Sequence, residues 1–77
     1  MRKPDAAVHK AVLDVLKHAP STPIAIADIV FHTSGGKLRP EVDQVQAVLD
    51  QLAMDSKVRF RRHEKWYRRR YEILKEG

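Results

Sequence analysis

The side chains best able to bind a ligand in this 77-residue sequence are the arginines and lysines of one short segment. Residues 57–70 contain eight of them and a single acid, Glu64, whereas residues 1–56 contain six basic and seven acidic side chains. Guanidinium groups bind phosphate bidentately, and charge concentrated in one segment raises the local potential. The segment therefore predicts a polyanionic partner. The alternative interpretation is a solvated surface hairpin whose charge only keeps the protein in solution.

The other reactive side chains form no catalytic or metal-binding pattern that we recognise. The chain has no cysteine, which excludes disulfides, thiolate metal sites and thiol nucleophiles. His9 and His18 are nine residues apart and fall on opposite sides of one predicted helix, so they cannot share a metal ion. Asp14 and His18 have the spacing of an ordinary surface pair, and Gly35-Gly36 is typical of a turn. We therefore expect no enzyme, and neither a cofactor nor a metal.

The elements that must position the basic segment are three predicted helices. Apolar residues recur at spacings of three and four over residues 5–19 and 40–55, which predicts two helices with one buried face each. A shorter helix is predicted over residues 26–33, after a stub of strand at 24–26. Pro40 suits the first position of the third helix, because the N–H that proline lacks would have no partner there.

From residue 57 the apolar pattern changes to the period of two that is typical of a half-buried strand. We expect a hairpin over residues 57–71 with its tip at 63–65. The side chains predicted to point inward are Val58, Phe60, Tyr67, Tyr71 and Ile73, and those predicted to point outward are Arg59, Arg61, Arg68 and Arg70. Trp66 near the tip is expected either to stack on a base or to pack over the third helix as part of the core.

The order of helix, stub, short helix, turn, helix and basic hairpin resembles the winged helix-turn-helix superfamily. In size the chain is similar to the small single-domain regulators of bacteria and phages. The segments that carry the resemblance are residues 24–30 and 45–52 as the two helices of the motif, 33–39 as its turn, and 57–60 and 66–68 as the strands of the wing. The expected fold is one domain over residues 1–77, mainly α with a small antiparallel β-hairpin (α+β), a three-helix winged helix-turn-helix. The resemblance implies a transcriptional regulator that binds double-stranded DNA, with the third helix in the major groove and the wing on the backbone or minor groove.

The residues expected to contact nucleic acid lie before the third helix, on it and in the wing. The outer face of that helix carries Asp43 and Asp50, and this favours an alternative in which the face docks a protein partner. Arg39 near the helix start is interpreted either as a phosphate ligand or as an exposed arginine without a role. The predicted nucleic-acid-binding residues are Lys37, Arg39, Gln44, Gln51, Arg59, Arg61, Arg62, His63, Lys65, Trp66, Arg68 and Arg70.

The chain begins without the apolar stretch of a signal peptide and has no apolar run of the roughly 20 residues that a membrane span needs. We therefore expect a cytoplasmic protein, nucleoid-associated if bacterial, that does not bind a membrane. Single-stranded nucleic acid is the alternative ligand, because exposed aromatic side chains among basic residues suit unpaired bases. One module of this size offers a small contact area, so a homodimer or a protein partner is a further alternative.

Overall fold

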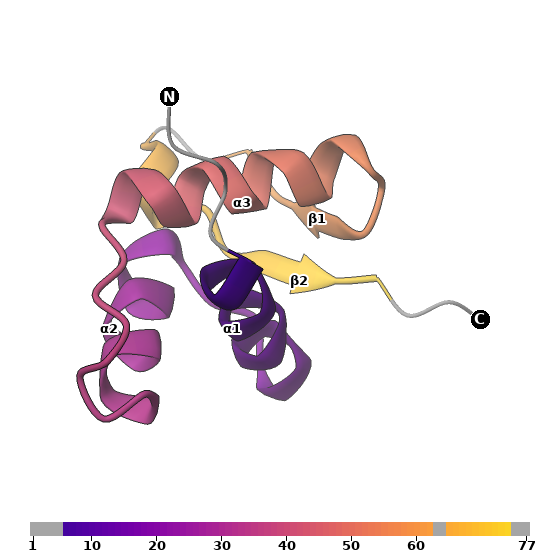
Figure 1. Ribbon diagram of the computed structural model, residues 1–77. Helices are drawn as coiled ribbons and strands as arrows, with labels where there is room; N and C mark the ends of the chain where they lie inside the picture. Colours follow the sequence, from indigo (N-terminus) through magenta and orange to yellow (C-terminus); the bar gives the residue numbers. More distant parts are fainter. Residues whose placement is uncertain (1–5, 63–64, 75–77) are drawn as a thin grey trace.

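The structure, a computed structural model, describes residues 6–62 and 65–74. Its elements follow in the order α1 (Ala6–His18), α2 (Pro23–Thr33), α3 (Val42–Met54), β1 (Val58–Phe60), a 3-10 helix η1 (Trp66–Arg68) and β2 (Tyr71–Ile73) (Figure 1). The three helices pack on one another, and β1 and β2 form a two-stranded antiparallel sheet that contacts α1 and α3. The predicted fold class, mainly α with a small antiparallel hairpin in a winged-helix-like layout, is confirmed.

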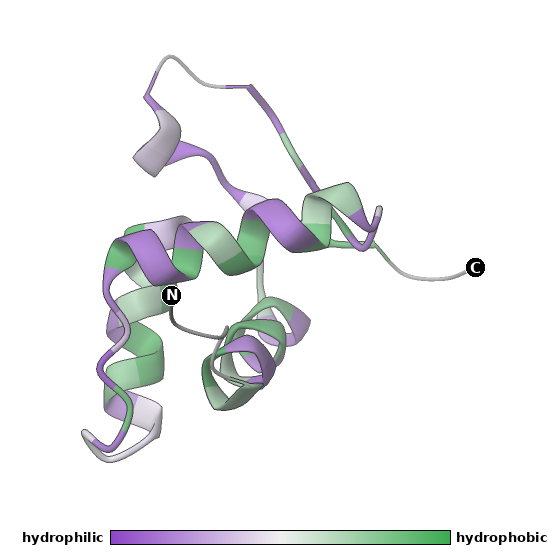
Figure 2. Cartoon of the chain, turned by 45° about the horizontal axis from the view of Figure 1, so that its top comes forward, coloured by the Kyte–Doolittle hydropathy of each residue, from purple (hydrophilic) through white to green (hydrophobic). Residues whose placement is uncertain are grey.

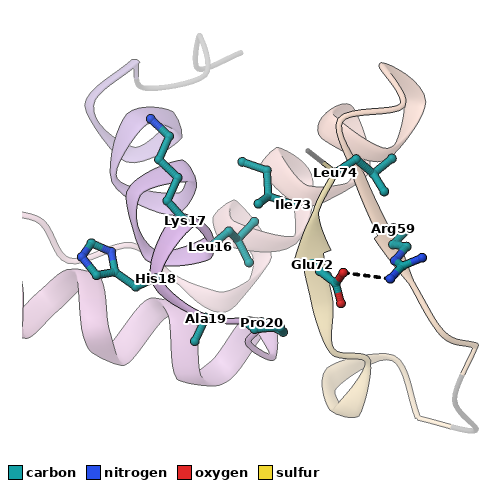
Figure 3. A pocket seen from close by; sticks show the side chains of 9 residues that line it. All are labelled: Leu16, Lys17, His18, Ala19, Pro20, Arg59, Glu72, Ile73 and Leu74. Carbon is teal, nitrogen blue, oxygen red and sulfur yellow. Dashed lines mark hydrogen bonds and ion pairs between the residues drawn. The ribbon is translucent and has the colours of Figure 1, made fainter. Parts of the chain in front are cut away.

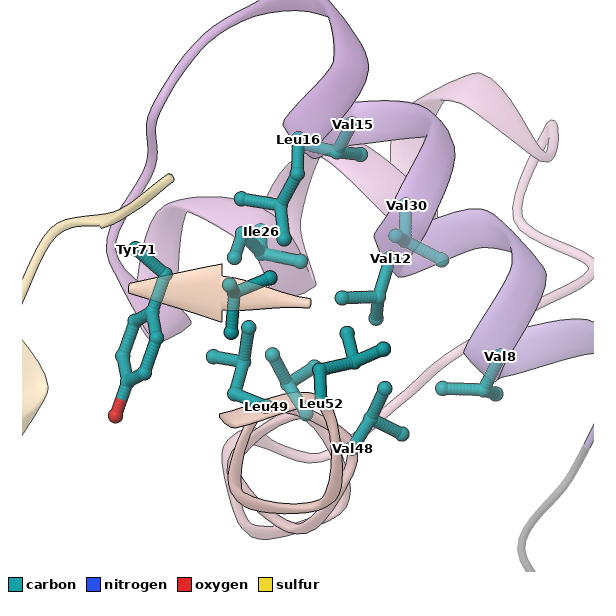
Figure 4. Close-up of a cluster of buried hydrophobic side chains, with 12 residues drawn as sticks. Val8, Val12, Val15, Leu16, Ile26, Val30, Val48, Leu49, Leu52 and Tyr71 are labelled. Atoms are coloured by element: carbon teal, nitrogen blue, oxygen red, sulfur yellow. The ribbon is translucent and has the colours of Figure 1, made fainter. Parts of the chain in front are cut away.

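One hydrophobic core joins the three helices to the sheet. The hydropathy colouring shows both hydrophobic and hydrophilic residues along α1 and α3, whereas α2 is mostly hydrophobic (Figure 2). The buried apolar side chains are drawn in Figure 4: Val8, Val12, Val15, Leu16, Ile26, Val30, Val45, Val48, Leu49, Leu52, Val58 and Tyr71. Burying a side chain of this kind contributes about 1.5–3 kcal/mol relative to leaving it exposed. The apolar stripes predicted for the first and third helices are thus confirmed except at one end of each. Ala19, predicted to end the first stripe, lies beyond α1 and is exposed, and Val42, predicted to open the other, is half-buried and outside the core.

Helix α2 begins at Pro23, so the predicted start at residue 26 and the strand stub at 24–26 are wrong. Thr22 is the N-cap of α2, and its Oγ1 accepts a hydrogen bond from the N–H of Ala25 at 3.4 Å. Pro23 then occupies the first helical turn, where it removes no hydrogen bond. The strand-like pairing falls earlier in the chain, because Ser21 forms an isolated antiparallel bridge with Tyr71.

Helix α3 begins at Val42, two residues after the predicted start at Pro40. Glu41 is the N-cap and forms a capping box with Gln44, whose side-chain oxygen accepts from the N–H of Glu41 at 2.9 Å. A capping box satisfies N–H groups that the first turn of a helix leaves unpaired. Pro40 therefore precedes the helix instead of opening it.

Helix α3 ends in a left-handed turn at a residue other than glycine. Ser56 has φ of 57°. The N–H of Lys57 donates to the carbonyl of Leu52 at 2.9 Å, and that of Ser56 donates to the carbonyl of Ala53 at 3.1 Å. These two bonds are the Schellman arrangement that closes a helix and reverses the chain. The turn leads directly into β1.

The sheet pairs residues 58–60 with residues 71–73, in the register Val58↔Ile73, Arg59↔Glu72 and Phe60↔Tyr71. The second strand is therefore Tyr71–Ile73, and the prediction of a strand that starts at Trp66 is wrong. Trp66–Arg68 form η1 instead. The sequence there was predicted to have the period of a strand, but the pairing between β1 and β2 covers only residues 58–60 and 71–73.

Candidate nucleic-acid interface

The structure places most of the predicted cations on the connection between β1 and β2. We call residues 61–70 the basic loop. Its described residues are 61, 62 and 65–70. Five of its cations are exposed, namely Arg61, Arg62, Lys65, Arg68 and Arg70, and Arg69 is half-buried. The outward position predicted for Arg68 and Arg70 is therefore confirmed. Within the basic loop, η1 contacts α2.

Arg59, on β1, has its charge paired across the sheet. Its Nη2 donates to Oε1 of Glu72 at 2.9 Å, directly across the sheet (Figure 3). The side chains of Arg59 and Glu72 are 68% and 45% exposed, so solvent screens the pair and it contributes little to stability. Its main effect is to hold the Arg59 guanidinium over the outer face of the sheet, the face turned away from α3.

Trp66 lies outside the hydrophobic core. Its side chain is 41% exposed, and its ring meets that of Tyr67 edge to face at a centroid distance of 5.7 Å. Of the two predictions for this residue, packing into the core is wrong, and stacking on a base remains a prediction. Tyr67 was predicted to return to the core, but it is half-buried and not among the core residues. His63, at the predicted tip, lies outside the described residues.

The inner face of the sheet is joined to α3 by contacts that the sequence pattern did not predict. Tyr71 is fully buried, and its hydroxyl accepts a hydrogen bond from Nε2 of Gln46 at 2.9 Å. The same nitrogen donates to Asp50 at 2.7 Å. The ring of Phe60 packs on that of Tyr71 at 4.9 Å, and the guanidinium of Arg69 lies 5.5 Å from the centre of the Phe60 ring. These contacts fix the base of the hairpin against α3.

Arg69, like Lys57, is a basic residue of segment 57–70 that the predicted nucleic-acid-binding set leaves out. A period of two places it on the same side as Tyr67 and Tyr71, so the signal was present in the pattern. Its guanidinium covers Phe60, which was predicted to be buried and is 37% exposed. Among the described residues nothing accepts a hydrogen bond from its buried Nε. Arg69 therefore acts in packing the hairpin, and it is set apart from the exposed cations around it.

The two glutamines of α3 that were predicted to contact nucleic acid are engaged within their own helix. Gln44 belongs to the capping box with Glu41. Nε2 of Gln51 donates to the carboxylate of Asp55 at 3.3 Å and 3.4 Å. The solvent-facing residues of α3 are otherwise Asp43, Ala47, Asp50 and Met54, and Met54 is 79% exposed. This face is acidic and contains no cation.

Lys37 and Arg39 lie between α2 and α3, and both are exposed. Arg39 was predicted to sit at the start of the third helix. It lies before the N-cap Glu41, and its guanidinium lies 5.5 Å from the centre of the Phe31 ring. A cation–π contact on an exposed ring is worth about 0.5–1 kcal/mol. The structure thus separates these two cations in sequence and in element from the basic loop.

The described part of the chain offers no other arrangement with recognisable chemistry. Within residues 6–62 and 65–74, no group of three or more His, Cys, Asp or Glu side chains is placed to hold a metal ion. No helix in these ranges combines the length and the apolar character needed to cross a membrane. Comparison of the chain with protein-family models, with curated proteins and with solved structures finds no match.

Proposed function

We propose that this chain is a nucleic-acid-binding module of the winged-helix type, a small regulator of transcription that holds the backbone of DNA with its basic loop and catalyses no reaction. The observation that carries the proposal is the concentration of eight basic residues and one acid in residues 57–70. Five of the basic side chains there are exposed on the basic loop, and Arg59 is paired with Glu72 across the sheet.

The kind of cation supports phosphate as the ligand. Six of the eight basic residues in the segment are arginine. Arginine presents a planar fork of donors that matches a phosphate group, whereas lysine acts as a point charge. Arginine also enters narrow minor grooves, where the negative potential is strongest. A solvated hairpin that needed charge only for solubility would have no such preference for arginine.

The composition of α3 argues against reading of the major groove by this helix. The carboxylates of Asp43 and Asp50 would face the phosphates of a duplex on either side of the groove. Gln44 and Gln51, the side chains best suited to adenine, already bond to Glu41 and Asp55. We therefore assign binding to the basic loop, and expect little dependence of affinity on base sequence.

The first test is the affinity of the purified chain for a fluorescein-labelled 20-base-pair duplex, followed by fluorescence anisotropy between 50 and 200 mM salt. If three phosphates are neutralised, the affinity falls roughly 40-fold over this range. Changing Arg61, Arg62, Arg68 and Arg70 together to Gln should weaken binding at least 100-fold at 50 mM salt, while K10Q, on the exposed side of α1, changes it less than twofold. A chain that binds no duplex at 50 mM salt, or binds it equally well at both salt concentrations, contradicts the proposal.

A second candidate function follows from the outer face of α3. This face combines two carboxylates with a thioether that is 79% exposed, a composition better suited to a basic protein surface than to a polyanion. The variant D43N/D50N separates the candidates. Unchanged or tighter binding of duplex leaves the nucleic-acid role intact, whereas loss of a co-purifying protein favours the protein-docking role.

A further inference from the structure

The outer face of the two-stranded sheet contains a basic hollow that the winged-helix layout does not require. Three arginines surround it, Arg59 from β1 and Arg61 and Arg70 from the basic loop, together with Pro20, Phe60 and Glu72. Its volume is about 570 Å³. The hollow therefore holds three cations against one carboxylate, and Glu72 is already bonded to Arg59 at 2.9 Å.

The remaining two arginines, Arg61 and Arg70, come directly after β1 and directly before β2, next to the last pair of the sheet, Phe60↔Tyr71. Both side chains are exposed, and both line the hollow. Like charges that line the same hollow repel each other. A bound anion between the two guanidinium groups removes this repulsion, so the free protein is arranged as an incomplete site.

A second hollow of about 540 Å³ adjoins the first and shares Pro20, Arg59 and Glu72 with it (Figure 3). It lies between the last turn of α1 and β2, where Lys17 and His18 form part of its wall. The two hollows make one continuous surface that runs from the end of α1 across the sheet to the basic loop. Glu72 is the acidic residue among the side chains that line it.

This surface is directed away from the acidic face of α3. The buried side chain of Tyr71 lies on the opposite face of the sheet, and its hydroxyl bonds to Gln46 on α3. A polyanion held between Arg61 and Arg70 therefore has the sheet between itself and α3. Asp43 and Asp50, which make α3 unsuited to a groove, are then not brought against phosphates.

We propose that Arg61 and Arg70 form a phosphate clamp on the outer face of the sheet, and that the nucleic acid runs across this face and the end of α1 instead of along α3. The inference rests on the proposed function and deepens it, because it names the residues that hold the backbone and the side of the molecule on which the ligand lies. Arg59 adds a third donor to the clamp, and in the free protein Glu72 partly neutralises its charge.

The test divides the fourfold glutamine variant into two matched pairs. R61Q/R70Q removes the clamp, and R62Q/R68Q removes the same charge from the rest of the basic loop. Both pairs change long-range electrostatics equally, so a difference between them reports direct contact. We expect R61Q/R70Q to bind the labelled 20-base-pair duplex and a labelled dT12 strand at least 10-fold more weakly than R62Q/R68Q does at 50 mM salt.

The melting temperature, measured without ligand, shows whether weaker binding comes from loss of folding. Because each single change relieves the repulsion between the two arginines, R61Q and R70Q should raise the melting temperature, by about 1–5 °C. Equal affinities of the two double variants, with the fourfold variant still defective, would overturn the clamp and leave the proposed function standing. Absence of nucleic-acid binding by the natural chain would overturn both. If a labelled ten-residue polyglutamate peptide binds and the oligonucleotides do not, the surface serves an acidic protein and the clamp proposal is wrong.

Glu72 gives a test in the opposite direction. E72Q removes the carboxylate of the hollow and frees Arg59, so affinity for the duplex should rise about 2- to 5-fold. The slope of log affinity against log salt concentration should steepen by roughly the amount that one further phosphate contact contributes. D28N removes the same charge from an exposed position on α2 and should change affinity less than twofold. Weaker binding by E72Q would show that the ligand does not occupy the hollow.

Discussion

At the scale of single residues, Tyr71 and Gln46 connect the helices to the basic hairpin. Tyr71 is fully buried, pairs with Phe60 across the sheet and bridges through its backbone to Ser21. Its hydroxyl is the one polar group that it brings into this environment, and Gln46 satisfies it at 2.9 Å. A buried hydroxyl without a partner is costly, so the glutamine fixes where α3 meets the sheet.

We predict that Q46A destabilises the protein by about 1–3 kcal/mol, because the Tyr71 hydroxyl then loses its donor in a part-buried place. Urea unfolding followed by circular dichroism measures the change. Q51A is the matched control, since Gln51 is exposed and bonds to Asp55 within the same helix. It should cost less than about 0.5 kcal/mol. Equal losses in the two variants would show that the bond to Tyr71 has no structural role.

The residue scale also shows what a pattern of residue types cannot predict. The exposure of Arg68 and Arg70 followed from the alternation in the sequence. The pairing of Arg59 with Glu72 and of Gln46 with Tyr71 did not, because both depend on contacts between residues 13 and 25 positions apart. The candidate site was therefore predicted as a set of cations, while its division into paired, packed and exposed members needed the structure.

At the scale of elements, the helices were predictable because their apolar stripes are long and local. α1 and α3 are each 13 residues long, and each buries one apolar face. The starts of α2 and α3 were misplaced because a proline is compatible both with a turn and with the first turn of a helix. The second strand was misplaced because a period of two in residues 66–71 favours a strand only where a partner strand is available, and pairing is non-local.

The turn between α3 and β1 carries the prediction that belongs to this scale. Ser56 adopts φ of 57°, a region that residues with a Cβ rarely occupy. S56G should therefore stabilise the protein by about 0.5–1 kcal/mol and raise its melting temperature by roughly 2–8 °C. S56A keeps the Cβ and should give no such gain. A lower melting temperature for S56G would mean that the serine side chain contributes more than its backbone conformation costs.

At the scale of the whole molecule, charge is distributed unevenly between two adjoining parts. The acids of α3 and the cations of the basic loop are held in place by one core, and the inner face of the sheet joins them through Tyr71 and Gln46. This separation of charge gives the molecule a preferred side for a polyanion. The arrangement of helices and sheet does not by itself settle which surface binds a ligand, because binding depends on the residues placed on the fold.

The central claim is that the basic loop, and not α3, holds the nucleic acid. The most direct test is to map backbone amide chemical shifts of labelled protein during titration with a 12-base-pair duplex at 50 mM salt. The account predicts that the largest shifts fall on residues 59–62, 65–70 and 72, and that Asp43, Ala47, Asp50 and Met54 stay unchanged. Largest shifts on the outer face of α3, with the basic loop unaffected, would contradict it.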